Sequence, residues 1–205
     1  MSFCRIAGRA MLAAVTLACA IAAADAQQPG RIRGQIEKAD GQMLTLKTRE
    51  GATMQVRLAD DARVGALEKA SLTDIKPDSF IGIAGMPRPD GSIEAFSIHI
   101  FQPAQRGVVA DRHGPWDARP GSTMTNAYVE GMSTEKDGDT LKVKYKDGEK
   151  TIHINPQTVI AATAKGDKSE LKPGAQIIIM GSDKRPDGFV TAKTLYVGRG
   201  VSPAM

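Results

Sequence analysis

The sequence predicts an all-β protein made of two tandem small OB-like β-barrels joined by an irregular linker. Three observations support this: short runs of alternating apolar residues, turns rich in Asp, Gly and Pro between them, and a second half that repeats the landmarks of the first. We expect a first β-barrel module over 27–102, a linker over 103–125, a second module over 126–199 and a tail over 200–205. A two-sheet sandwich would show the same periodicity and stays open as an alternative.

The first 26 residues have the pattern of an export signal. Arg5 and Arg9 precede an uncharged apolar run over 10–24, and small residues follow up to Ala26. We therefore expect a signal peptide that is cleaved after Ala26 and a periplasmic mature chain without a membrane span. The apolar run is shorter than the about 20 residues that a transmembrane helix needs. A lipid anchor on Cys19 is disfavoured because Thr16 stands where a large aliphatic residue is required.

Cleavage would also remove both cysteines, Cys4 and Cys19, and would lower the formal net charge from +4 to +3. The mature chain could then form no disulfide, no thiolate metal site and no cysteine nucleophile. Its mild basicity does not resemble the stripe of positive charge that binds a polyanion.

The internal repeat is visible as landmarks in constant order. Asp40-Gly41 corresponds to Asp137-Gly138 at an offset of 97, and Lys76-Pro77 corresponds to Lys172-Pro173 at an offset of 96. The sequence Arg-Pro-Asp-Gly occurs at 88–91 and again at 185–188. The chain therefore predicts two copies of one module, with hairpin turns at the Asp-Gly pairs.

Each copy should contain the same series of short elements. Two strands paired across the first turn and a third strand come first, then one helical turn that ends before Lys-Pro, then a strand buried on both faces and a last alternating strand. For the five elements after the first turn, the expected ranges are 43–48, 54–58, 71–75, 80–84 and 93–101 in the first copy, and 140–145, 151–154, 169–171, 175–180 and 190–197 in the second.

The segment between the copies breaks this pattern and contains the only tryptophan of the chain. Its candidate binding residues are Arg112, His113, Trp116, Asp117 and Arg119. In one interpretation Trp116 packs into the seam between the barrels while the charged residues stay solvated. In the other, these residues form a recognition patch, since Arg and Trp often anchor interfaces.

The run His113-Gly114-Pro115-Trp116-Asp117-Ala118-Arg119-Pro120-Gly121-Ser122-Thr123-Met124-Thr125-Asn126-Ala127, together with the two modules, resembles an uncharacterised family of exported alpha-proteobacterial proteins. Repeats in that family are similar to a domain of unknown function with an OB-like barrel. Its members often carry the label of a metal transporter permease. A permease needs several membrane spans, and this chain has no span after the signal. The resemblance implies fold and location rather than chemistry.

The sequence does not predict an enzyme or a cofactor. It contains no nucleophile elbow, phosphate loop or dinucleotide-binding glycine motif, and its three histidines are scattered. No metal site is predicted, and the weak candidates are His113 and Asp117. Low aromatic content and mixed charge argue against nucleic acid.

We therefore expect a noncatalytic periplasmic binding or interaction protein. Its partner would be an envelope protein, a glycan or a small solute. The alternative is a soluble accessory protein that binds a metal ion or small solute for an ABC-type transporter.

Overall fold

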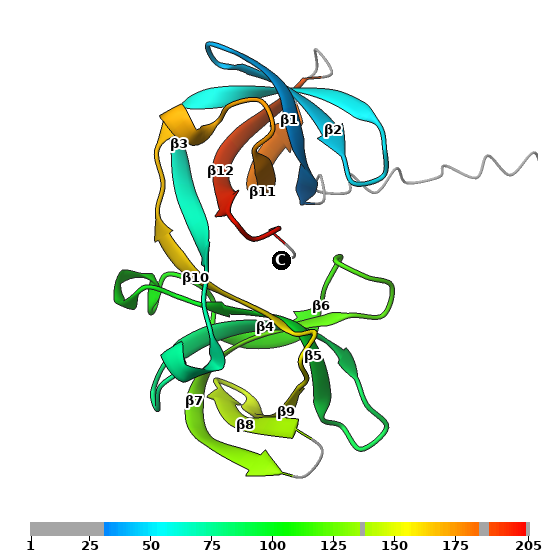
Figure 1. Cartoon of the computed structure of the whole chain (residues 1–205), viewed down its shortest axis with the longest axis vertical. Helices are drawn as coiled ribbons and strands as arrows, with labels where there is room; N and C mark the ends of the chain where they lie inside the picture. The colour runs from blue at the N-terminus through cyan, green and yellow to red at the C-terminus, as the bar shows by residue number, and fades with distance from the viewer. Residues whose placement is uncertain (1–30, 136–137, 185–188, 204–205) are drawn as a thin grey trace, which may run out of the picture.

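The computed structural model describes residues 31–135, 138–184 and 189–203, and this part of the chain is all-β, as predicted (Figure 1). Twelve strands and three short 3₁₀ helices are present in it. The first half contains β1 (Ile32–Asp40), β2 (Met43–Thr48), β3 (Thr53–Lys69), η1 (Leu72–Asp74), β4 (Phe80–Pro87), β5 (Ile93–Ile100) and η2 (Pro103–Gln105). The second half contains β6 (Arg112–Pro115), β7 (Thr123–Glu135), β8 (Gly138–Tyr145), β9 (Gly148–Ile154), β10 (Val159–Lys165), η3 (Lys168–Glu170), β11 (Gln176–Lys184) and β12 (Val190–Arg199).

The strands close into two five-stranded barrels, which form the two lobes of Figure 1. The upper barrel runs β1-β2-β3-β12-β11 and returns to β1, and its β3–β12 pairing is parallel. The lower barrel runs β7-β8-β9-β5-β4 and returns to β7, with the parallel pairing between β5 and β9. Closure leaves no long unpaired edge, as expected for small OB-like barrels.

The tandem arrangement, with one barrel over 27–102 and another over 126–199, is not confirmed. Each barrel takes three strands from one half of the chain and two from the other. The chain crosses once along β3, which continues straight from the upper barrel toward the lower, and returns along β10, which pairs antiparallel with β3 (Figure 1). The periodicity of apolar residues predicts a strand and its buried face. It does not predict which of two similar segments pairs with that strand, and domain swapping arises from the same ambiguity.

Each barrel has its own apolar core, and a third cluster fills the seam between them. The predicted inward faces are confirmed, since Leu44 and Leu46 are buried in the upper barrel and Leu141 and Val143 in the lower. The seam cluster consists of small and medium apolar residues from both barrels, namely Leu67, Ala84, Met124, Ala161 and Ile178. It joins the lobes by packing as well as by the crossing strands.

The first hairpins of the two barrels differ in length. The β1–β2 hairpin ends at the pair Asp40–Met43, and Gly41 in its turn has φ 55°, as the Asp-Gly signal predicts. The β7–β8 hairpin continues for two further pairs, up to Glu135 and Gly138. Asp137, the predicted counterpart of Asp40, lies outside the described residues.

The expected helical turns occur as η1 and η3, but the linker prediction was incomplete. Within residues 103–125, β6 pairs with β7, so this segment is partly a strand and belongs to the lower barrel.

Candidate functional site

Trp116 lies against the seam cluster, as the first interpretation of the central segment expects. The guanidinium of Arg31 stacks on the indole at 3.6 Å from the ring centroid. Hydrogen bonds fix the loop that follows Trp116. The backbone N–H of Trp116 donates to the Ser122 carbonyl at 2.8 Å, and the Ser122 hydroxyl donates to the Arg119 carbonyl at 2.8 Å. The only tryptophan of the sequence is therefore a packing residue between the barrels.

Asp117 and Ala118 hold this loop against the upper barrel. The Asp117 carboxylate accepts a hydrogen bond from Arg33 at 2.8 Å and lies 3.5 Å from Arg31, while Arg49 donates to the Ala118 carbonyl at 2.9 Å. Burial alone would raise the pKa of Asp117, but Arg33 and Arg31 hold it below its ordinary value. We call these contacts the clasp, because they join residues from the two barrels.

The other predicted site residues point to separate neighbours. His113 Nδ1 shares a hydrogen bond of 2.8 Å with the Thr125 hydroxyl, and burial lowers the pKa of His113. Arg119 stacks on Phe96 at 3.9 Å, whereas Arg112 is exposed on β6. His113 and Asp117 thus have different partners, and no group of three possible metal-ligating side chains occurs among residues 31–135, 138–184 and 189–203.

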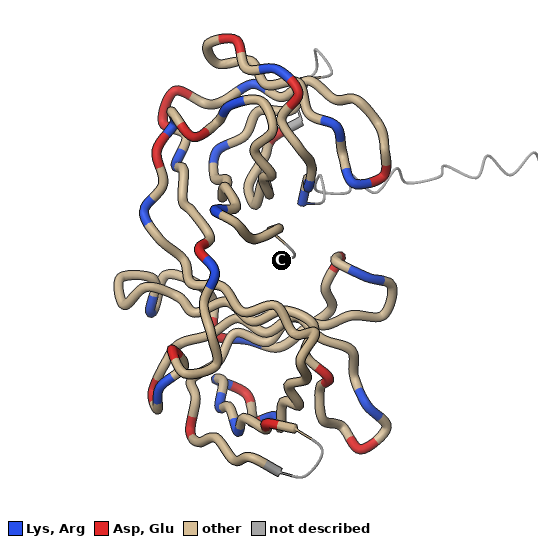
Figure 2. Tube along the Cα trace, viewed as in Figure 1, with Lys and Arg blue, Asp and Glu red and all other residues tan. Residues whose placement is uncertain are grey.

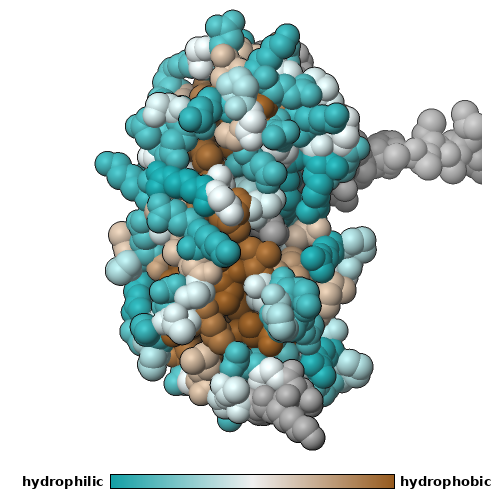
Figure 3. All heavy atoms as spheres, viewed as in Figure 1, coloured by the Kyte–Doolittle hydropathy of each residue, from teal (hydrophilic) through white to brown (hydrophobic). Residues whose placement is uncertain are grey.

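A hollow lies elsewhere on the described surface, at one end of the lower barrel. It is a groove of about 740 Å³ that runs from η1 and the β9–β10 turn to the C-terminal tail. Its apolar walls are Leu72, Ile154, Val159, Ile160 and Val201. Figure 3 shows apolar side chains gathered in a hollowed strip over the lower lobe and up to the seam. A mainly apolar hollow of this size is typical of a small-molecule site.

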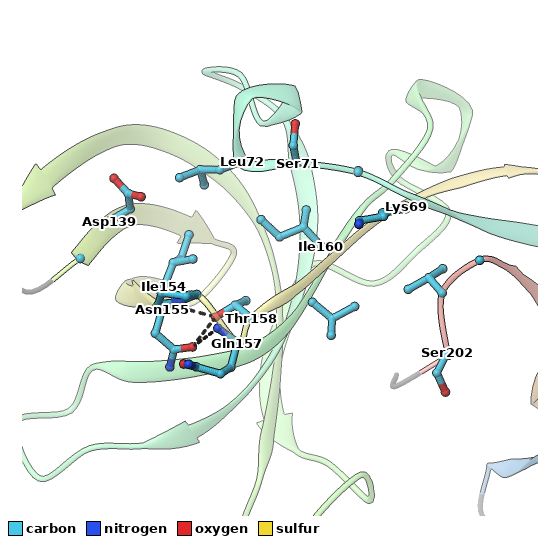
Figure 4. A pocket seen from close by; sticks show the side chains of 16 residues that line it. Lys69, Ser71, Leu72, Asp139, Ile154, Asn155, Gln157, Thr158, Ile160 and Ser202 are labelled. Atoms are coloured by element: carbon cyan, nitrogen blue, oxygen red, sulfur yellow. Dashed lines mark hydrogen bonds between the residues drawn. The ribbon is translucent and has the colours of Figure 1, made fainter.

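The polar groups of this groove come from the β9–β10 turn, from one end each of β3 and β8, from Ser71 before η1 and from Ser202 of the tail. Asn155 begins the turn, where its backbone N–H donates to the Thr158 hydroxyl at 3.1 Å and its side-chain oxygen accepts from the Gln157 N–H at 2.9 Å. Figure 4 shows this turn beside Ile154 and Ile160, with Leu72 and Asp139 on the opposite side. Lys69 and Asp139 are the only charged residues of the lining, so the groove has no formal net charge.

The upper barrel carries polar and charged side chains at the equivalent place. Lys168 is the first residue of η3, as Leu72 is the first residue of η1. The ammonium of Lys168 donates to the Asp60 carbonyl at 3.0 Å. The Gln42 amide adds a hydrogen bond of 2.6 Å to the Asp60 carboxylate. In the lower barrel an aliphatic residue replaces the lysine, and the longer β7–β8 hairpin adds Gly138 and Asp139 as a wall. The aliphatic residue at the start of η1 therefore distinguishes the lower barrel, and the tail that follows β12 completes the groove.

The backbone around the groove is already paired. β10 bonds to β5 over Val159–Ala162 and to β3 over Ala161–Lys165, and the Ala70 N–H donates to the Ile160 carbonyl at 3.0 Å. An extended peptide therefore finds no free strand edge here to pair with. The groove can offer apolar contact and a few side-chain hydrogen bonds, which suits a small ligand.

No family profile, curated protein or solved structure matches the chain. The described part of the chain contains no helix that is long and apolar enough to cross a membrane. The resemblance to the exported alpha-proteobacterial family stays a prediction.

Sequence reasoning missed the groove because its walls are ordinary aliphatic residues brought together by strand exchange. One signal was present in the sequence, namely Leu72 standing where the second copy has Lys168. Comparison of the two copies position by position would have marked this difference.

Proposed function

We propose that this protein is a noncatalytic binding protein of the periplasm that holds a small amphiphilic solute in the groove of the lower barrel. The carrying observation is that the groove is mainly apolar beside η1 of the lower barrel, whereas Lys168 and Gln42 hydrogen-bond to Asp60 at the same place of the upper barrel. The export pattern of residues 1–26 supports the location. A solute-binding accessory role beside a transporter is compatible with the same groove.

The lining also supports a role without catalysis. It contains no histidine or cysteine, and the hydroxyl of Ser71 donates to the Asp74 carboxylate at 2.7 Å within the cap of η1. Asn155 has its side-chain amide bonded to Glu94 at 2.6 Å. These polar groups are held by structural hydrogen bonds, so they fix the walls rather than form a nucleophile and base pair.

The test uses the neutral fluorescent amphiphile N-phenyl-1-naphthylamine as probe. We expect saturable binding with one site per chain and at least about tenfold weaker binding by Leu72→Lys, because the change removes an apolar wall and inserts a charge. The lysine also recreates the residue that the upper barrel carries at this place, so the variant should keep its thermal unfolding midpoint.

Two variants serve as controls. Lys168→Leu changes the matching residue of the upper barrel and should leave the affinity of the groove unchanged. Val108→Ser removes a side chain that is 78% exposed and outside the groove. Equal probe binding by wild type and a folded Leu72→Lys variant, or equal weakening by Val108→Ser, would show that the probe does not occupy the groove.

A further inference from the structure

A second hollow lies on the upper barrel, where β1, β2 and β11 meet the C-terminal tail. It measures about 420 Å³, and we call it the basic cleft because its charged lining residues are Arg33, Lys47 and Arg49, without an acid. Ser202 and Pro203 of the tail form the facing wall. Figure 2 shows basic positions on the upper lobe beside the space between the lobes.

The lower barrel has three aromatic rings at the matching place. Phe80 stacks between Tyr128 and Phe101 with centroid separations of 4.8 Å and 5.1 Å. Gln35 and Tyr128 are equivalent because they pair with Lys47 and Lys144 at the same level of their hairpins. Gln176 and Phe80 are equivalent in turn, since they pair with Gln35 and Tyr128.

The third ring, that of Phe101, follows β5, and Gly198 holds the matching position on β12. The carbonyl of Val201 packs against Gly198, where any side chain would collide with it. The tail thus lies where the lower barrel has a ring. Gln35, Gln176 and Gly198 thus stand where the lower barrel has Tyr128, Phe80 and Phe101. The hollow at this place is lined by the cations of the basic cleft.

Positive charge is in excess around this cleft. Arg33 has a side chain only 7% exposed and binds Asp117, the one carboxylate of the clasp. Arg49 lies 3.9 Å from the Glu50 carboxylate and donates one hydrogen bond to the Ala118 carbonyl, and Lys47 is exposed. Burial lowers the pKa of Arg31. Repulsion from Arg33 and Arg112 also lowers it, whereas the contact with Asp117 acts in the opposite direction. The carboxylates of Asp117 and Glu50 are therefore outnumbered by the cations around them.

We propose that the basic cleft binds a small dianion of the phosphate-monoester class, independently of the apolar groove. Lys47 and Arg49 supply two positive charges that match the dianion, and guanidinium groups bind phosphate oxygens by paired hydrogen bonds. Arg33 lines the cleft from its buried position, where Asp117 holds its guanidinium. The polar amides of Gln35 and Gln176 and the hydroxyl of Ser202 can hydrogen-bond the ester part.

Trp116 provides the readout, because it is the only tryptophan and its ring lies under Arg31, beside the clasp. We expect glycerol 3-phosphate to change its emission saturably at low ionic strength, whereas sodium chloride of equal ionic strength gives no saturable change. The double variant Lys47→Gln and Arg49→Gln should bind at least about tenfold more weakly, as expected for lost charge-assisted hydrogen bonds.

The matched control is Lys144→Gln with Lys146→Gln, which changes the equivalent strand end of the lower barrel and should keep the wild-type affinity. Vesicles that contain phosphatidic acid, the phospholipid with a phosphate-monoester headgroup, against vesicles of phosphatidylcholine form a second arm, read by sedimentation. Binding of glycerol 3-phosphate that depends on Lys47 and Arg49 identifies a free solute, and vesicle binding with that dependence identifies a lipid headgroup. Failure of both probes, or equal loss in the control variant, overturns the proposal.

Discussion

His99 makes the stability of this protein sensitive to mild acid. The imidazole is 1% exposed on β5, at the seam, and its strand neighbours are Gly82 on β4 and Ala161 on β10, neither of which can pair with it. Among the described residues Nδ1 has no hydrogen-bond partner. Burial without a compensating charge lowers the pKa of His99 from 6.5 to about 3.

Proton linkage gives the direction in which the free energy of unfolding changes with pH. The unfolded chain binds a proton at His99 below about pH 6.5, while the folded chain keeps the imidazole neutral down to about pH 3, so the free energy of unfolding falls as pH falls through this window. One pKa unit corresponds to about 1.4 kcal/mol, which gives a loss of about 2 kcal/mol between pH 7.5 and pH 5. Above pH 7 the contribution is constant, because both states are neutral.

Urea unfolding of wild type and His99→Leu at both pH values measures this loss. The variant has a similar volume and no titratable group, so the wild type should lose about 2 kcal/mol more than the variant on acidification. The comparison removes the contribution of His113, whose lowered pKa acts in the same direction in both proteins. His99→Gln repeats the test with a polar residue. Equal pH dependence in wild type and both variants would refute the reasoning.

Two other predictions concern the exchanged strands and the clasp. Gln35 and Gln176 are exposed and directly paired across β1 and β11. The double variant Gln35→Cys with Gln176→Cys should therefore form an intramolecular disulfide, detected by peptide mapping. The double variant Gln35→Cys with Phe80→Cys should form none. A link to position 80 would contradict the exchange. Asp117→Asn should lower the free energy of unfolding by about 1–2 kcal/mol, because it removes the carboxylate that faces the buried Arg33. Asp183→Asn, which breaks an ion pair exposed on both sides, should change it by less than about 0.5 kcal/mol; equal losses would contradict the clasp.

Local structure was predictable from the sequence because it depends on short-range rules. Alternation of apolar residues placed Leu44 and Leu141 correctly inside the barrels, and Lys-Pro marked the ends of η1 and η3. The strand pairing between the halves was not predictable, because β4 and β11 have the same pattern and either can close either barrel. The continuous run of β3 through residues 59–62 decides the matter, whereas the sequence predicted a third strand over 54–58 only.

The candidate site was missed for a related reason. The unrepeated segment drew attention because of its Trp, Arg and His residues, but in the structure Trp116 and Asp117 hold the two barrels together. Residues that fasten a seam are chosen for large contact area and charge pairing, as are residues that bind a partner, so composition alone cannot separate the two roles.

Differences between the two copies are more informative than the segment between them. Both barrels share strand order, caps and core, so a position that differs without a change of fold is free to serve another purpose. Leu72 against Lys168 opens a groove in the lower barrel, and Gln176 against Phe80 opens a cleft in the upper one. Because the exchanged strands make the barrels one folding unit, each barrel can lose packing at one place while the other supports it. The two barrels thus carry two different hollows, one mainly apolar and one basic, on a single scaffold.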